Sequence, residues 1–188
     1  MNIDHSREKL FHAMAFFINA TRNCGKIKLF KLLYFLDFTH YQETGRSVTG
    51  MNYHAWKMGP VPVALFEGID APKGPFLEGR FEIVPSPSGS FSPTQIKPTF
   101  PVDLDLFSTR ELRAMEFFAN KYRAATAQEM IEDTHLENRP WHTVWEKQGA
   151  KQELIPYALA LRAAEREEME ELIQERESFL LELGLAAS

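Results

Sequence analysis

The chain has 188 residues, of which 44% are apolar and 25% charged, and its formal net charge is −5 at pH 7. These totals are typical of a globular domain with a substantial core. The negative charge disfavours nucleic-acid binding, which needs basic faces that displace counterions from phosphates. Cys24 is the only cysteine, which excludes an internal disulfide and a cysteine-rich zinc site and fits a reducing cytoplasm.

Hydrophobic spacing predicts two helices near the N-terminus. Residues 6–20 place apolar side chains on one helical face, and no signal peptide is predicted there. Residues 28–38 (KLFKLLYFLDF) are apolar on every side of a helical wheel, so other elements must surround this helix. It is too short to span a bilayer, which needs about 20 apolar residues. We expect it to be capped by Asn23 and to end at Gly45.

Extended structure is predicted in the middle of the chain. Residues 53–57 form a strand candidate, followed by a turn at 58–60 and a short helix with Pro62 in its first turn. Seven of the eleven prolines lie between residues 71 and 101, where 80–84 and 94–97 are further strand candidates. We predict a small hairpin or edge sheet that pairs with residues 53–57. An irregular surface loop, such as the PSPSG run at 85–89, is the alternative.

Two capping boxes predict a helical hairpin at residues 108–136. Ser108 with Glu111, and Thr126 with Glu129, have the spacing at which each side chain satisfies the other residue's backbone N–H. The second helix would be acidic, without a lysine or arginine, and would repel DNA phosphates. A DNA-binding transcriptional or phage regulatory protein that uses this hairpin therefore remains only as the alternative function.

The last helix is predicted to begin at Pro156 and to run to Leu183, over about 40 Å. Its expected apolar stripe consists of Leu161, Met169, Leu172, Phe179 and Leu183. Its acidic ridge consists of Glu167, Glu171 and Glu175. Like charges at this four-residue spacing destabilise a helix by a few tenths of a kcal/mol per pair. The ridge is either a solvated face or an acidic surface complementary to a basic partner.

Together these elements predict a mainly α fold, with a buried central helix and a small β-hairpin or edge sheet as an addition. We expect one domain over residues 1–188. Its segments are 6–70 (N-terminal helices and a strand-to-helix corner), 71–101 (proline-rich loop with short strands), 102–150 (helical hairpin and a third short helix) and 156–183 (C-terminal helix).

The sequence offers no strong catalytic or metal-binding pattern. His135 and His142 lack a metal-ligand spacing, and nothing beside Cys24 supplies a base. Asp37 and His40 are interpreted as a local structural link, with an acid–base pair as the alternative. We therefore expect no enzyme activity, no metal and no cofactor. An enzyme would have to be centred on Asp37, His40 or His54.

Two patches of the chain resemble the SocA-like antitoxins that carry the Panacea domain. The first is KLLYF at residues 31–35, followed by the turn at Gly45 and by AWKMGPV at 55–61. The second is THLE at 134–137, followed by Pro140 and Trp141. The resemblance covers about residues 10–150 and leaves the C-terminal helix outside.

This resemblance implies the antitoxin of a bacterial or phage toxin–antitoxin system, with a link to phage defence. Its partner would be a cognate toxin protein, which the chain would neutralise by direct binding in the cytoplasm. No membrane and no nucleic acid would take part, and the resemblance is compatible with homo-oligomers of the chain. The toxin class does not follow, because the family serves varied toxins. The motif residues that we interpret as scaffold, with toxin contact as the alternative, are Leu33, Tyr34, Gly59, Pro60, His135, Pro140 and Trp141. The candidate partner-binding residues are Lys31, Trp56, Lys57, Glu167, Glu171 and Glu175.

Overall fold

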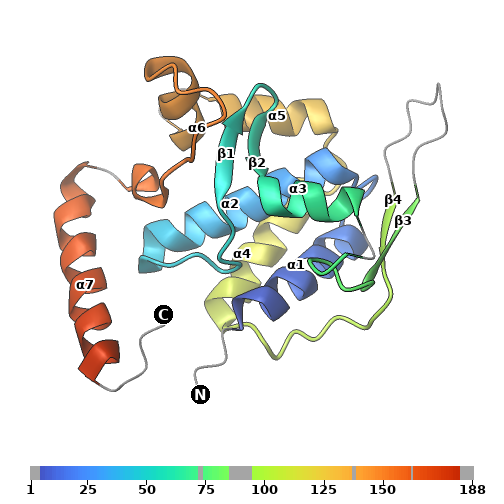
Figure 1. Cartoon of the computed structure of the whole chain (residues 1–188), viewed down its shortest axis with the longest axis horizontal. Helices are drawn as coiled ribbons and strands as arrows, with labels where there is room; N and C mark the ends of the chain where they lie inside the picture. Colours follow the sequence, from blue (N-terminus) through green and yellow to red (C-terminus); the bar gives the residue numbers. More distant parts are fainter. Residues whose placement is uncertain (1–4, 72–73, 85–94, 137–138, 162, 183–188) are drawn as a thin grey trace.

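The computed structural model describes residues 5–71, 74–84, 95–136, 139–161 and 163–182. The PSPSG run, Glu137 and Leu183, which entered the sequence predictions, lie outside these residues. The fold is mainly helical with small antiparallel strand pairs, as predicted (Figure 1). In chain order the elements are α1 (Ser6–Ala20), α2 (Lys26–Thr44), β1 (Tyr53–Trp56), β2 (Gly59–Pro62), α3 (Val63–Asp70), β3 (Phe81–Val84), β4 (Gln95–Pro98), α4 (Thr109–Lys121), α5 (Ala127–His135), α6 (Pro140–His142), the π-helical turn η1 (Thr143–Lys147), the 3-10 turn η2 (Tyr157–Ala160) and α7 (Ala163–Glu182).

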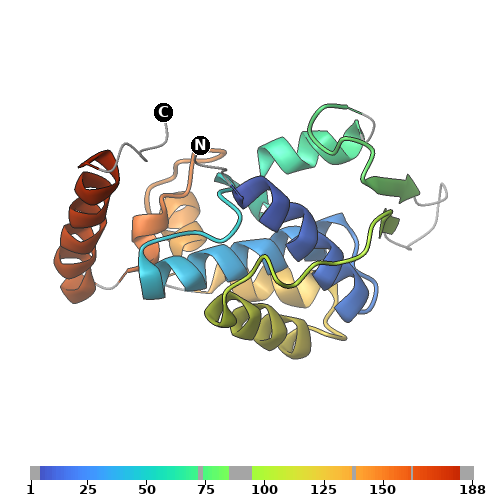
Figure 2. The ribbon, with the colours of Figure 1, turned by 90° about the horizontal axis from the view of Figure 1, so that it is seen from below.

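Helix α2 lies at the centre of the fold, as its all-round apolar surface predicted. Figure 2 shows it running through the middle of the molecule, and α1, α4, α5 and β2 contact it. Every side chain from residue 28 to residue 38 is buried. The helix begins after Gly25 and not at the predicted cap Asn23, which has a φ of 50°. Gly45 ends the helix as predicted, with a left-handed φ of 69°.

Both predicted capping boxes are present and define the helical hairpin of α4 and α5. Glu111 accepts a hydrogen bond from the Ser108 backbone N–H at 2.7 Å, and Ser108 Oγ accepts from the Glu111 N–H. Thr126 and Glu129 make the same reciprocal pair. Each box satisfies two backbone donors that the first helical turn leaves without partners.

The strand pairing differs from the prediction. Residues 53–56 pair with β2, which occupies the predicted turn, in the register Tyr53↔Pro62 to Trp56↔Gly59. The turn between the strands contains only residues 57 and 58, and Gly59 follows it with a φ of 93°. The two prolines of β2 are tolerated because its free side needs no ladder donors. The other side of β1 exchanges backbone hydrogen bonds with residues 152–155.

The second strand pair, β3 and β4, is the predicted hairpin of the proline-rich window. Its register runs from Phe81↔Pro98 to Val84↔Gln95, and it does not join the β1–β2 pair. Phe81 and Ile96 are buried and belong to the main hydrophobic core. The hairpin is therefore attached to α1 through its side chains, and the predicted pairing with residues 53–57 is wrong.

The C-terminal helix begins later than predicted. The Tyr157 hydroxyl donates to the carbonyl of Met51 at 2.6 Å, and Leu161 is buried in extended backbone. These contacts hold residues 156–161 against the body, so α7 starts at Ala163 and its 20 residues span about 30 Å. Figure 1 shows α7 standing beside the body, next to the end of α2. Leu172 and Phe179 of the predicted apolar stripe are exposed.

Candidate functional site

Residues from four separate elements meet beside the middle of α2. We call this group the motif cluster and define it as Lys31 of α2, Gly59 of β2, Thr134 and His135 of α5, and Trp141 of α6. Its members are more than 100 residues apart at the extremes of the sequence, and the two resembling patches supply all of them. The structure therefore brings the two patches together in one place.

Lys31 and Gly59 fit each other closely. Only 1% of Lys31 is exposed, and its Nζ donates to the carbonyl of Pro60 at 2.8 Å. A Cβ atom on Gly59 would lie 2.7 Å from Lys31 Nζ and 2.7 Å from Thr134 Oγ1, so no side chain has room there. Burial lowers the pKa of Lys31 to about 7, because the apolar surroundings disfavour the ammonium.

The aromatic part of the cluster joins α5, α6 and β1. The rings of His135 and Trp141 are stacked, with centroids 3.7 Å apart and planes at 5°. The indole N–H of Trp141 donates to the carbonyl of Trp56 at 2.9 Å. Burial lowers the pKa of His135, and the charge of Lys31 lowers it further, so the imidazole is neutral at pH 7. The cluster fastens the helices to the β1–β2 hairpin.

Burial decides which motif residues can touch a partner. Lys31, Leu33 and Tyr34 are buried, as are Pro140 and Trp141. Lys31, which we predicted to bind a partner, is buried in this conformation, and its Nζ donates to the carbonyl of Pro60. These buried residues connect the hairpin to the helices and present little surface to solvent.

The tip of the β1–β2 hairpin is the exposed end of the motif region. Lys57 is exposed, and 49% of Met58 is exposed beside it. Trp56 is half-buried, with its ring centroid 5.1 Å from that of Phe66. The tip thus offers one cation and one large apolar side chain to solvent.

The acidic ridge lies on α7, far along the chain from the hairpin. Glu167, Glu171 and Glu175 are all exposed. Within the part of the chain that the structure describes, none of the three forms an ion pair. Figure 1 shows α7 and the hairpin tip at different ends of the molecule, so the two predicted partner-binding surfaces are not one surface.

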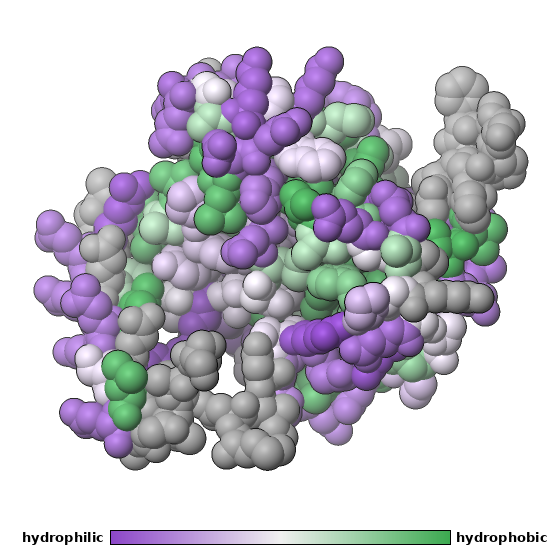
Figure 3. All heavy atoms as spheres, in the orientation of Figure 1, coloured by the Kyte–Doolittle hydropathy of each residue, from purple (hydrophilic) through white to green (hydrophobic). Residues whose placement is uncertain are grey.

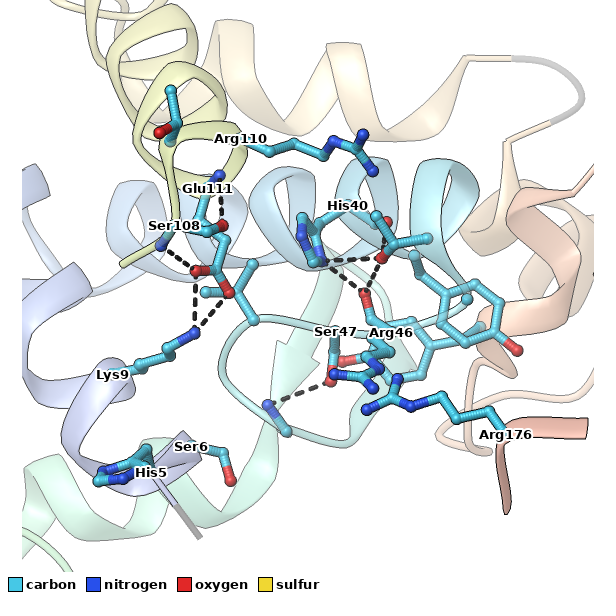
Figure 4. A pocket seen from close by; sticks show the side chains of 17 residues that line it. His5, Ser6, Lys9, His40, Arg46, Ser47, Ser108, Arg110, Glu111 and Arg176 are labelled. Carbon is cyan, nitrogen blue, oxygen red and sulfur yellow. Dashed lines mark hydrogen bonds and ion pairs between the residues drawn. The ribbon is translucent and has the colours of Figure 1, made fainter. Parts of the chain in front are cut away.

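A groove that the sequence did not predict opens between α1, the end of α2, the start of α4 and α7. Its volume is about 1120 Å³. Figure 4 shows Arg46, Arg110 and Arg176 reaching into it from three different elements. We call it the arginine groove. These arginines are 64 and 66 residues apart in the sequence, so no local pattern could have grouped them.

An ion pair closes one wall of the arginine groove. Lys9 Nζ lies 2.7 Å from Glu111 Oε1. Burial by itself would raise the pKa of Glu111, but the hydrogen bonds from Lys9 and from the Ser108 backbone lower it overall. Burial lowers the pKa of His40, whose Nδ1 lies 2.8 Å from the carbonyl oxygen of Arg46. The Lys9–Glu111 pair is electrically balanced, so the arginines determine the charge of the groove.

The suggested acid–base pair of Asp37 and His40 is not formed. Asp37 is fully buried and accepts hydrogen bonds from the backbone of Val48 and Thr49, and from the hydroxyls of Thr49 and Tyr53. Burial raises the pKa of Asp37, while these hydrogen bonds oppose the rise. Asp37 therefore has a structural role, but it closes the loop that follows α2 and makes no hydrogen bond to His40.

The surroundings of Cys24, His135 and His142 do not favour a reactive or metal-binding role either. Burial raises the pKa of Cys24 to about 11, so its thiol is protonated and unreactive at pH 7. Among the described residues, no three His, Cys, Asp or Glu side chains are placed to hold a metal ion, including those near His135 and His142. Nor does any described helix combine the length and apolar character needed to cross a membrane.

Comparison with known proteins identifies the family. The model of the family described as "Antitoxin SocA-like, Panacea domain" matches residues 29–142, which is more than half of the chain. The match covers α2 through α6 and includes the whole motif cluster, whereas α1 and α7 lie outside it. No curated protein and no solved structure matches the chain. The chain therefore belongs to the SocA-like antitoxin family and contains its Panacea domain.

Proposed function

We propose that this chain neutralises a cognate protein toxin by binding it directly in a stoichiometric complex. The family supports an antitoxin role in general. The mode of action is inferred from the surface of α7, which displays charge and apolar side chains that the fold itself does not use.

One face of α7 packs against the end of α2. A Cβ atom on Gly45 would lie 2.9 Å from Ile173 Cγ1 and 3.1 Å from Met169 Sδ. Arg176, one further turn along, lines the arginine groove. Residues 169, 173 and 176 have the spacing of one helical face. This face therefore points toward the end of α2.

The opposite face of α7 is the proposed toxin-binding surface. Glu171 and Glu175 line a shallow hollow of about 540 Å³ together with Phe179, of which 58% is exposed. Leu172 and Leu181 nearby are 54% and 66% exposed. Figure 3 shows hydrophobic atoms among hydrophilic ones where α7 lies, at the lower left. Large apolar side chains exposed within a charged rim are typical of an interaction surface.

The negative charge of this face favours a toxin with a basic surface. Three glutamates at a repeated four-residue spacing repel one another, and no described cation pairs with them. A basic surface on the toxin would relieve this repulsion and accelerate encounter. We infer that Phe179 and Leu172 supply apolar contact area, while the acidic ridge orients the toxin.

Co-expression with the neighbouring reading frame tests the proposal. Expression of that frame alone should stop growth, and this chain should restore it and co-purify with the toxin at a fixed ratio. Changing Glu167, Glu171 and Glu175 together to Lys should weaken the complex about tenfold or more and reduce its salt dependence. The matched control changes Glu82, Glu116 and Glu132, which are exposed elsewhere, to Lys and should leave affinity unchanged.

Two results would count against this proposal. Equal affinity of the ridge variant and its control would remove the acidic ridge from the interface. Retention of the chain on duplex DNA in a gel-shift assay at physiological salt, without any complex with the toxin, would favour the alternative of a DNA-binding regulator. Glu129 and Glu132 of α5 are exposed and would repel DNA phosphates, which favours toxin binding over DNA binding.

A further inference from the structure

The arginine groove contains three cationic side chains that have few counter-charges among the side chains that the structure describes. Within the described residues, neither Arg46 nor Arg176 has a carboxylate within ion-pair distance. The only one near Arg110 belongs to Glu43, at 3.9 Å, and both side chains are more than half exposed. A surface pair of this kind contributes little, so Arg110 also remains available.

The guanidinium groups share one region of the groove. Figure 4 shows the side chains of Arg46 and Arg176 approaching each other near Ser47, with Arg110 on the wall opposite. Like charges in such proximity repel unless an anion lies between them. This concentration of positive charge is unexpected in a chain whose formal net charge is −5. The groove is therefore an anion-accepting surface on an otherwise acidic protein.

The dimensions and surroundings of the groove narrow the choice of anion. Its volume of about 1120 Å³ exceeds the usual size of a small-molecule pocket, which is about 300–1,000 Å³. Hydroxyl groups, such as those of Ser47 and Ser108, line it as well as arginines (Figure 4). A nucleic acid would have to continue past Glu43 and over the surface of a chain whose net charge is −5, where its phosphates would be repelled. A short acidic peptide segment would not extend that far.

We propose that the arginine groove binds an acidic segment of the toxin polypeptide, with its carboxylates held by Arg46, Arg110 and Arg176. A guanidinium presents two parallel N–H donors that match the two oxygens of a carboxylate. This assignment rests on the proposed function, since the segment belongs to the same toxin. Helix α7 then lies between two contact surfaces, with Arg176 on the groove side and the acidic ridge on the other.

Charge reversal in the groove, with a matched control, tests this assignment. The groove variant changes Arg46, Arg110 and Arg176 to Glu. Position 110 lies in the first turn of α4, where a glutamate is compatible with the helix dipole. The control variant changes Arg22, Arg113 and Arg123 to Glu, which alters the net charge equally at exposed positions outside the groove.

Toxin affinity should fall about tenfold or more for the groove variant and change less than about twofold for the control. A labelled hexaglutamate peptide should bind the wild type and the control, and not the groove variant. Circular dichroism establishes whether each variant is folded. If the groove variant fails to fold, the milder pair Arg46→Gln with Arg176→Gln should still lower toxin affinity severalfold.

The possible failures are distinguishable. Unchanged toxin affinity in the groove variant overturns the groove assignment and leaves the proposed function intact. Absence of any complex between the wild type and the toxin overturns both. If a short oligonucleotide binds in place of hexaglutamate, and only the groove variant loses it, the groove is a nucleic-acid site and the peptide assignment is wrong.

Discussion

The motif cluster and helix α7 differ in how far their side chains are exposed to solvent. The cluster contains a buried lysine, a buried tryptophan and a half-buried histidine, each with a specific neighbour. Helix α7 instead exposes leucine, phenylalanine and unpaired glutamate side chains. The family match includes the first region and stops before the second. The family match thus coincides with the closely packed part of the molecule, whose exposed end is the hairpin tip at Lys57 and Met58, while the exposed face of α7 lies outside the match.

This division implies that the buried cluster and the exposed surfaces differ in how freely their residues can change. The buried contacts of the motif cluster fix the positions of the hairpin and the helices and leave little room for change. A peripheral helix and an open groove can change their charges without affecting the core, since surface substitutions usually alter stability by less than about 0.5 kcal/mol. Substitutions in the two regions should therefore have different kinds of effect.

The largest expected effect is on stability, from Gly59→Ala. The added Cβ would meet Lys31 Nζ and Thr134 Oγ1 at 2.7 Å, and φ at this position is 93°. We expect a loss of about 3 kcal/mol or more in the free energy of unfolding, measured by urea denaturation. Gly149→Ala is the control, because its φ is 63° but nothing lies within 4 Å of the new Cβ. It should lose only about 1 kcal/mol. Equal losses would mean that the cluster is not closely packed.

The next effect concerns the pH dependence of stability and isolates Lys31. Its pKa falls from 10.5 in the unfolded chain to about 7 in the fold. Between these values the unfolded state binds one more proton, so this residue makes stability rise with pH. The wild type should gain roughly 2 kcal/mol between pH 7 and pH 9 relative to Lys31→Met. Urea denaturation of both proteins at each pH provides the comparison.

The difference between the two proteins is needed because other groups titrate in the same range. Burial raises the pKa of Cys24 to about 11, which lowers the stability of both proteins above pH 9. That contribution cancels in the comparison. A difference that does not change with pH would show that Lys31 keeps its charge in the fold and that water reaches it.

The smallest expected effect on stability comes from Phe179→Ser, which should nevertheless weaken the toxin complex. With 58% of Phe179 exposed, its replacement should change the free energy of unfolding by less than about 0.5 kcal/mol. Affinity for the toxin should fall about tenfold, since exposed aromatic anchors contribute strongly to interfaces. Phe117→Ser is the control, because Phe117 is 60% exposed on α4 and should change neither quantity strongly. Calorimetry of the complex measures both variants.

Local sequence patterns predicted the helical part of this fold well. The capping boxes at Ser108 and Thr126 involve residues only three apart, so their geometry follows from local sequence. The apolar run of α2 required burial on all sides, and that burial is present. Strand β2 was missed because two prolines in four residues indicate a turn unless the strand lies at an edge.

The remaining errors arose from contacts between distant residues. The start of α7 depends on Tyr157 binding the carbonyl of Met51, which lies 106 residues earlier in the chain. The arginine groove depends on three arginines carried by different elements. The closeness of Lys31 to Gly59 and Thr134 could likewise not be predicted, although the two resembling patches contain every residue of the motif cluster. Tertiary placement, and not residue type, was the missing information.

Hydrogen–deuterium exchange of this chain, alone and in complex with its toxin, tests the central claim most directly. We predict that the toxin slows exchange in α7 and around the arginine groove, at residues 45–47 and 108–111, and leaves the already protected residues 31–35 unchanged. Slower exchange confined to other surfaces, with α7 and the groove exchanging as in the free protein, would contradict the account.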